Sequence, residues 1–299
     1  MLAIVERGDN EALKATVLNN LAILYRNQGK YAEAEPLYQR ALRIREEGLG
    51  TDHQDTATSQ DNLAILYMGL GRYAEAEQLY HRALRTREKV LGIEHRDTAT
   101  SLNNLAILYR IQGKYAEAER FYQRALQARE RGLGTEHRDT ATVLNNLANL
   151  YMDQGGFAES ERFNQRALQI REKVLGMEHP DTASSLNNLA VVYLNQGKYA
   201  EAESLCQMAL RIREEALGPE HSETAVSLNN LAALYRAQGN YAAAEPLYQR
   251  ALRIQEKALG SEHPDTADIL DNLGILYHSV GEYAKANKYL SDKLIEAGY

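Results

Sequence analysis

Six histidines recur at the same position of a regular pattern, and an acidic residue follows each of them two places later. Imidazole and carboxylate groups are common zinc ligands, so this pairing raises the possibility of a metal site. Zinc needs its ligands within about 2.3 Å of one point, whereas equivalent side chains of stacked helical units stay about 10 Å apart. We therefore predict no metal site, and we expect the histidines to cap helices or fix connectors. They are His53, His95, His137, His179, His221 and His263.

Other catalytic patterns are missing from the sequence. Each Gly-Lys pair is followed by Tyr rather than Ser or Thr, which excludes a phosphate-binding loop of the usual kind. Neither an HExxH segment nor a nucleophile elbow occurs. The single cysteine, Cys206, lies in an apolar helical stripe and is expected to be a small buried residue. These observations predict a protein that is not an enzyme, with no catalytic residue and no cofactor.

Composition limits the partners and the compartment. The chain has 299 residues, a formal net charge of −7, 44% hydrophobic residues and 25% charged residues, so it can form a large apolar core. The acidic balance argues against nucleic-acid binding. No run of about 18 apolar residues is present, which argues against a membrane span. The short apolar start MLAIV is not a signal peptide, so a cytoplasmic chain is favoured.

A period of 42 residues organises the whole chain. A fixed period of this size is typical of a stacked repeat array, in which no unit buries its apolar face alone. We therefore predict one array over residues 1–299, with residues 1–8 as the remnant of a preceding helix, and we expect the sequence to be a fragment of a longer array. The tyrosines that set the period are Tyr25, Tyr67, Tyr109, Tyr151, Tyr193, Tyr235 and Tyr277. The predicted repeats are 14–55, 56–97, 98–139, 140–181, 182–223, 224–265 and 266–299.

Each copy contains two helical patterns. In the third copy, Leu102, Leu105 and Tyr109 follow the spacing of one helix face, Gly113 interrupts it, and a second amphipathic pattern runs over 114–133. The chain is thus predicted to be all-α, with seven antiparallel helix pairs. We expect Ala118 and Ala125 to pack against large tyrosines such as Tyr122.

Two further expectations concern the second helices. Pro36 and Pro246 are predicted to bend their helices and to leave the carbonyls of Ala32 and Ala242 without their usual donors. The run from Arg124 to Glu130 mixes charges and is expected to form a solvated outer surface.

The pattern Leu-x-x-Leu-Ala-x-x-Tyr, then Gly, then Tyr-Ala-x-Ala resembles the tetratricopeptide repeat. The segment SLNNLAVVYLNQGKYAEAE (185–203) is similar to the 42-residue repeat of kinesin light chains, although no heptad-rich segment accompanies it. The resemblance implies a right-handed α-α superhelix whose first helices line a concave face that binds extended peptides. It implies nothing specific about the partner.

One asparagine recurs on the first helix of every copy, where it is an unfavourable residue. One interpretation is a ladder of amides that grips the backbone of a bound peptide, because an amide can both donate and accept. The other is that each asparagine bonds a neighbouring helix and orders the stack. The positions are Asn20, Asn62, Asn104, Asn146, Asn188, Asn230 and Asn272.

Beside the asparagines, two positions of the same helix face vary from copy to copy. Arg110 and Arg236 are candidates to pair with carboxylates of a partner, and Ile107 and Met152 are candidates for an apolar anchor. Asn149 occupies the same variable rows. The peptide-binding residues predicted from the sequence are therefore Asn62, Asn104, Asn146, Asn188, Asn230, Arg110, Arg236, Ile107, Asn149 and Met152.

The sequence predicts a non-enzymatic scaffold that binds a protein or peptide segment along its first helices. Two alternatives stay open: a sensor or oligomerisation arm of a larger signalling protein, and end-to-end self-association of the array.

Overall fold

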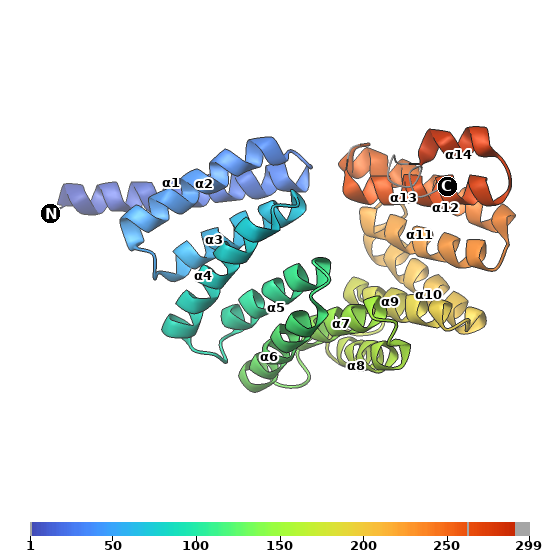
Figure 1. Cartoon of the computed structure of the whole chain (residues 1–299), viewed down its shortest axis with the longest axis horizontal. Helices are drawn as coiled ribbons and strands as arrows, with labels where there is room; N and C mark the ends of the chain where they lie inside the picture. The colour runs from blue at the N-terminus through green and yellow to red at the C-terminus, as the bar shows by residue number, and fades with distance from the viewer. Residues whose placement is uncertain (1, 262, 291–299) are drawn as a thin grey trace. The chain divides into compact units, whose positions relative to one another are not determined.

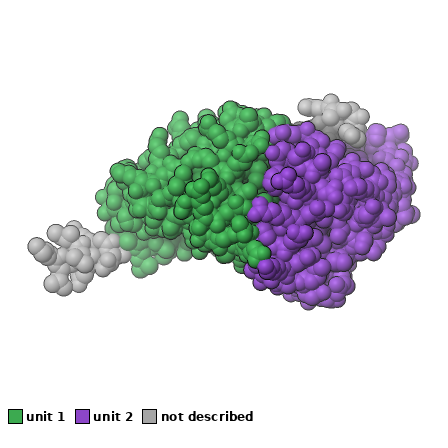
Figure 2. Space-filling view, turned by 90° about the horizontal axis from the view of Figure 1, so that it is seen from below, with its two compact units in different colours: residues 1–150 green, residues 151–299 purple. Residues whose placement is uncertain are grey.

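The computed structural model describes the backbone of residues 2–261 and 263–290, and the side chains from residue 11 onward within these ranges. This part of the chain is all-α and forms seven successive helix pairs (Figure 1). The chain divides into two compact units, residues 1–150 and 151–299, which Figure 2 shows in different colours. The helices are α1 (Leu2–Asn27), α2 (Tyr31–Leu49), α3 (Gln54–Gly69), α4 (Tyr73–Leu91), α5 (Arg96–Ile111), α6 (Tyr115–Leu133), α7 (Arg138–Asp153), α8 (Phe157–Leu175), α9 (Pro180–Asn195), α10 (Tyr199–Leu217), α11 (Ser222–Ala237), α12 (Tyr241–Leu259), α13 (Pro264–Ser279) and α14 (Tyr283–Tyr289).

The short turn inside each pair depends on glycine. Gly113 has φ 71°, a conformation that other residues rarely adopt. This backbone shape lets the Gly113 N–H donate to the Arg110 carbonyl at 3.0 Å and the Lys114 N–H donate to the Tyr109 carbonyl at 2.9 Å. The last carbonyls of α5 are thereby satisfied, and α6 starts directly afterwards.

The connector between pairs depends on histidine and threonine, which confirms a capping role for the recurrent histidines. Nδ1 of His95 accepts a hydrogen bond from the backbone N–H of Asp97 at 3.1 Å, at the start of α5. Oγ1 of Thr98 donates to the carbonyl of Gly92 at 2.8 Å, which fixes the end of α4 to the start of α5. The acidic residue after each histidine therefore supplies the backbone donor of the cap. The same histidine contact occurs at His53, His137, His179, His221 and His263.

The core packs as the residue sizes predict. Ala118, Tyr122 and Ala125 of α6 are all fully buried, so the small residues do lie beside a large ring. Within the two units the second helix of one pair packs on the first helix of the next, as α2 does on α3 and α12 does on α13. Repetition of this contact builds the array.

Helices α2 and α12 continue through Pro36 and Pro246 and have the same length of 19 residues as α4, so the expected bends and unbonded carbonyls stay predictions. Helix α1 is continuous from Leu2 to Asn27, where a preceding helix was expected to end at Gly8; no histidine cap occurs between residues 9 and 13 to start a new helix there.

The prediction of a fully solvated surface between Arg124 and Glu130 is wrong for Arg129. Its side chain is buried, with Nη2 donating to Oγ1 of Thr100 at 2.8 Å and Nη1 contacting the carboxylate of Asp139 at 3.1 Å. Arg124 fits the expectation better, because it forms a half-exposed ion pair with Glu88. No helix in the described part of the chain has the length and apolar character needed to cross a membrane.

Candidate peptide-binding surface

The recurrent asparagines of the first helices form a half-buried row. We call Asn62, Asn104, Asn146, Asn188, Asn230 and Asn272 the asparagine row; each of these side chains is partly accessible. A side chain in this position is held in place by its neighbours and can still reach a ligand. Asn20, the equivalent residue of α1, is exposed.

Three members of the row bond the preceding first helix. Nδ2 of Asn62 donates to Oδ1 of Asn19 at 3.0 Å, and Nδ2 of Asn146 donates to Oδ1 of Asn103 at 2.8 Å. The same contact, at 3.2 Å, joins Asn272 to Asn229. These amides order the stack of first helices, as one of the two interpretations from the sequence predicts.

The other three members make no hydrogen bond with their side chains among the described residues: Asn104, Asn188 and Asn230. For Asn104 the residue at the partner position is Asp61. Oδ2 of Asp61 accepts from Ser101 and Arg87, and its Oδ1 is buried without a hydrogen-bond partner among the described residues. For Asn230 the residue is Asn187, whose Nδ2 donates to Oγ of Ser227 at 2.9 Å, while its Oδ1 is likewise buried without a partner in the described part of the chain. These amides have both donor and acceptor capacity left for a ligand.

The variable rows beside the asparagines are also half-buried. Ile107 and Asn149 lie in the first unit, and Met152 lies in the second. Arg236 lies beside the buried hydroxyl of Tyr248: burial raises the pKa of Tyr248, and the guanidinium of Arg236 opposes this shift. Arg110 is half-buried and already has a polar contact within the protein. Arg236 thus directs part of its donor capacity at its own repeat, and Arg110 is engaged within the protein.

Sequence reasoning missed a second row of polar residues. Five arginines on the second helices repeat every 42 residues, and we call them the arginine column. Nη1 of Arg213 donates to Oγ of Ser227 at 3.0 Å and to the carbonyl of Glu223 at 2.8 Å, while Nη2 donates to Oγ of Ser184 at 2.9 Å. One guanidinium thereby joins three helices, α9, α10 and α11. The members are Arg45, Arg87, Arg129, Arg171 and Arg213.

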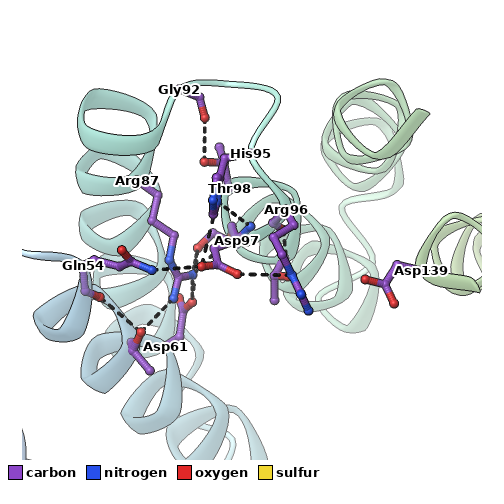
Figure 3. Close-up of polar contacts among 12 residues, drawn as sticks. Gln54, Asp61, Arg87, Gly92, His95, Arg96, Asp97, Thr98 and Asp139 are labelled. Carbon is purple, nitrogen blue, oxygen red and sulfur yellow. Dashed lines mark hydrogen bonds and ion pairs between the residues drawn. The ribbon is translucent and has the colours of Figure 1, made fainter. Parts of the chain in front are cut away.

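The second repeat contains the most charged version of this contact (Figure 3). Arg87 forms a buried ion pair with Asp61 of α3 and donates to Oγ of Ser101 at 2.5 Å. Burial raises the pKa of Asp61, and Arg87 opposes that shift. Figure 3 shows the two side chains turned toward each other beside Asp97 and His95. A signal for this network was present in the sequence, because a small hydroxyl residue follows most of these arginines by 14 positions.

Two features of the described residues bear on metal binding and on thiol reactivity. No group of three or more metal-ligating side chains occurs among them. Burial raises the pKa of the Cys206 thiol to about 12, which makes it a poor nucleophile. The helical array instead presents polar and apolar side chains along its first helices.

A tetratricopeptide repeat model matches residues 13–68, 60–131, 139–214, 183–257 and 227–292, which together include most of the chain. The chain belongs to the tetratricopeptide repeat family. Repeats of this family typically bind proteins. No curated protein sequence is significantly similar to the chain.

Solved structures place this tetratricopeptide repeat protein among kinesin light chain-like arrays. It is similar to BtubC (BKLC) from P. vanneervenii, with a TM-score of 0.59 and 26% identity over 81% of this chain and 94% of the other. A putative kinesin light chain from Podosopora anserina with nearly identical repeats gives a TM-score of 0.56 and 28% identity over 69% and 98% of the two chains. A Rap protein complexed with Competence and Sporulation Factor shares the fold, with a TM-score of 0.70 but only 15% identity, over 93% of this chain and 73% of the other.

Proposed function

We propose that this protein is a scaffold that binds an extended segment of a partner protein along its first helices, with the unbonded amides of the asparagine row on the segment's backbone. Arg110 and Arg236 then face side chains of the segment, and Ile107, Asn149 and Met152 line its apolar and neutral positions.

The observation that carries the proposal is that the side chains of Asn104 and Asn230 make no hydrogen bond with the described residues. Asparagine in the middle of a helix costs a few tenths of a kcal/mol relative to alanine. Asn62 and Asn146 offset this cost through a hydrogen bond to a neighbouring helix, whereas Asn104 and Asn230 make no such bond with the described residues. A half-buried amide in this condition is accessible to a ligand, whose backbone groups would take the place of the water that otherwise hydrates it.

Spacing supports a peptide as that partner. Adjacent first helices lie about 10 Å apart, which is close to three residues of an extended chain at about 3.3 Å each. Asn188 and Asn230 stand on the neighbouring helices α9 and α11, which contact each other. Two successive amides are thus placed to bond backbone groups about three residues apart.

The test uses a random 12-residue peptide library displayed on phage and selected against the wild-type protein. A selected peptide is then titrated calorimetrically against single alanine variants in matched pairs: Asn104→Ala with Asn146→Ala, and Asn230→Ala with Asn272→Ala. Because each lost backbone hydrogen bond is worth about 0.5–1.5 kcal/mol, we expect about 2- to 12-fold weaker binding for the first member of each pair. The second member is expected to lower the melting temperature instead.

Unchanged affinity in both Asn104→Ala and Asn230→Ala, with a folded protein, would refute the role of the amides. Failure to select any peptide that competes for the first helices would refute the binding function itself.

A further inference from the structure

A cation lies over the recurrent tyrosine of the first helix in most copies. In the third copy, Nζ of Lys114, the turn residue before α6, lies 5.4 Å from the centre of the Tyr109 ring. The negative face of an aromatic ring attracts a cation at this distance. The same contact, at 4.0–6.0 Å, is made by Lys30 over Tyr25, Arg72 over Tyr67 and Lys198 over Tyr193.

A glutamate of the preceding second helix also contacts this cation. Oε1 of Glu77 on α4 accepts a hydrogen bond from the Tyr109 hydroxyl at 2.8 Å, while Oε2 lies 3.8 Å from Nζ of Lys114. The ring and the carboxylate thus share one cation, and we call the two together the cation site of a copy. Equivalent ion pairs join Arg72 to Glu35 at 2.7 Å and Lys198 to Glu161 at 3.3 Å.

The last copy keeps a cation although its turn residue is acidic. Glu282 stands where the third copy has Lys114. Lys285, further along the chain, lies 5.0 Å from the centre of the Tyr277 ring. The Tyr277 hydroxyl again donates to the glutamate of the preceding second helix, at 2.8 Å to Oε1 of Glu245. Because two different positions supply the cation, the ring and the carboxylate are what define the site.

The sixth copy has the ring and the carboxylate without a cation. The Tyr235 hydroxyl donates to Oε1 of Glu203 at 2.9 Å, as in the third and last copies. The turn residue is Asn240, whose Oδ1 accepts from the backbone N–H of Ala243 at 3.3 Å and so caps α12. Among the described side chains, no cation lies over the Tyr235 ring, and Oε2 of Glu203 has no hydrogen-bond or ion-pair partner.

Both groups of this site are accessible to a partner, since Tyr235 and Glu203 are partly exposed. In the second copy a further carboxylate, that of Glu75 in the first turn of α4, pairs with Arg72 at 2.5 Å. Its equivalent in α12 is Ala243, which adds neither charge nor bulk beside the turn. The sixth copy therefore lacks both the internal cation and the second carboxylate that would compete for one.

We propose that the cation site of the sixth copy binds a basic side chain of a partner protein, with the Tyr235 ring and the Glu203 carboxylate as its two contacts. The chain itself indicates the occupant, because lysine lies over the tyrosine in four copies and arginine in one. A partner lysine would restore the contact that Asn240 does not make. The inference is confined to the sixth copy: in the fourth, which has Gly156 in the turn, the tyrosine and the glutamate belong to different compact units.

This site adds a requirement for a basic residue to the recognition of a partner. A cation over a partly exposed ring, together with a surface ion pair, strengthens binding about 3- to 30-fold. Tyr235 and Glu203 are not residues of the first-helix surface of the proposed function. The site can therefore be tested without a segment bound to that surface.

The probe is Nα-acetyl-lysine methylamide, which presents one lysine side chain without a charged backbone. The protein carries carbon-13-labelled tyrosine, nuclear magnetic resonance follows the ring signals during a titration, and Tyr235→Phe assigns the signals of Tyr235. We expect these signals to shift saturably, with a dissociation constant on the order of 10–100 mM for this single contact. Nα-acetyl-norleucine methylamide, which has no ammonium group, and potassium chloride at the same concentration are expected to leave them unchanged.

Three variants change the cation or the carboxylate. Asn240→Lys supplies the turn lysine of the third copy, so it is expected to weaken probe binding at Tyr235 at least about fivefold. Lys198→Asn gives the fifth copy the turn residue of the sixth, and the Tyr193 signals should then respond to the probe. Glu203→Gln keeps the size of the side chain without its charge and is expected to weaken binding about two- to fivefold.

The proposal is overturned if the Tyr235 signals do not respond to the lysine probe, or if the norleucine probe or potassium chloride shifts them equally. It is also overturned if Asn240→Lys, shown to be folded by circular dichroism, binds the probe as the wild type does. In folded Lys198→Asn, Tyr193 signals that do not respond would show that a ring and a carboxylate do not make a cation site, which overturns it as well. These results are independent of the peptide titrations of Asn104→Ala and Asn230→Ala, so failure of this site is distinguishable from failure of the proposed function.

Discussion

Replacement of Arg213 by glutamine tests whether the arginine column holds neighbouring repeats together. The guanidinium of Arg213 is buried and bonds Ser184, Ser227 and the backbone carbonyl of Glu223. A buried charged hydrogen bond contributes about 1.5–3 kcal/mol, and an orphaned hydroxyl costs about 1–3 kcal/mol. Because glutamine can replace one of these bonds, we expect Arg213→Gln to lower the free energy of unfolding by about 2–4 kcal/mol.

The next junction of the chain supplies the matched control. There, Gln255 stands at the position of the arginine, and both serines are replaced, by Val226 and Ile269. The triple variant Arg213→Gln, Ser184→Val, Ser227→Ile copies this junction. Well-packed apolar residues can replace a buried ionic contact at little cost, so we expect the triple variant to lie within about 1 kcal/mol of the wild type.

Urea denaturation followed by circular dichroism at 222 nm compares the four proteins: wild type, single variant, the double serine variant and the triple variant. The coupling between the arginine and the serines is the non-additive part of the three changes. The stabilising role of the column is refuted if Arg213→Gln is as stable as the wild type, or if the triple variant is as unstable as the single one. The first result would mean that the guanidinium contributes nothing net, and the second that the apolar residues do not compensate.

Two further predictions concern side-chain ionisation. Because burial raises the pKa of Cys206 to about 12, its thiol should react with a disulfide reagent at pH 8 about a thousandfold more slowly in the folded protein than in urea, and comparable rates would contradict its burial. Burial lowers the pKa of His81, which lies 3.1 Å from the Tyr109 hydroxyl. The folded state therefore disfavours protonation of this histidine, so stability is lost as the pH falls through its ordinary value of about 6.5. His81→Gln introduces the glutamine found at this position in five of the other copies. Its melting temperature should fall less than that of the wild type between pH 7.5 and pH 5.5. A difference between the two proteins that is constant with pH would refute this explanation.

The helices could be predicted closely from the sequence. The pattern of the third copy predicts a second helix over 114–133, and α6 begins at Tyr115 and ends at Leu133. This agreement has a local cause, because glycine turns and histidine caps depend on residues within the same connector. The burial of Ala118 and Tyr122 is similarly local, since their period of 3.6 residues identifies the buried face.

The arginine column could not be predicted from one copy. A run such as Arg124 to Glu130 has the charge pattern of a solvated helix, and only Arg124 and its exposed neighbours behave in that way. Arg129 of α6 is buried because it meets Thr100 of α5 and Asp139 of α7. A comparison of equivalent positions in different copies does predict it: where Gln255 replaces the arginine, the residues at the positions of its hydroxyl partners also change.

Whether an asparagine of the row bonds the preceding first helix varies with the residue 43 positions earlier. Periodicity alone therefore left open whether these amides are structural or bind a ligand. Where that residue is Asn19 or Asn103, the amide bonds it and the asparagine is structural. Where it is Asp61, the buried carboxylate is bonded to Arg87 and Ser101, and Asn104 makes no side-chain hydrogen bond with the described residues. In the second repeat Asp61 thus bonds Ser101 of the next first helix, α5, and Arg87 of its own second helix, α4. The contact between the neighbouring first helices α3 and α5 is made by a carboxylate and a hydroxyl, and under the proposed function the Asn104 amide is then available to a ligand.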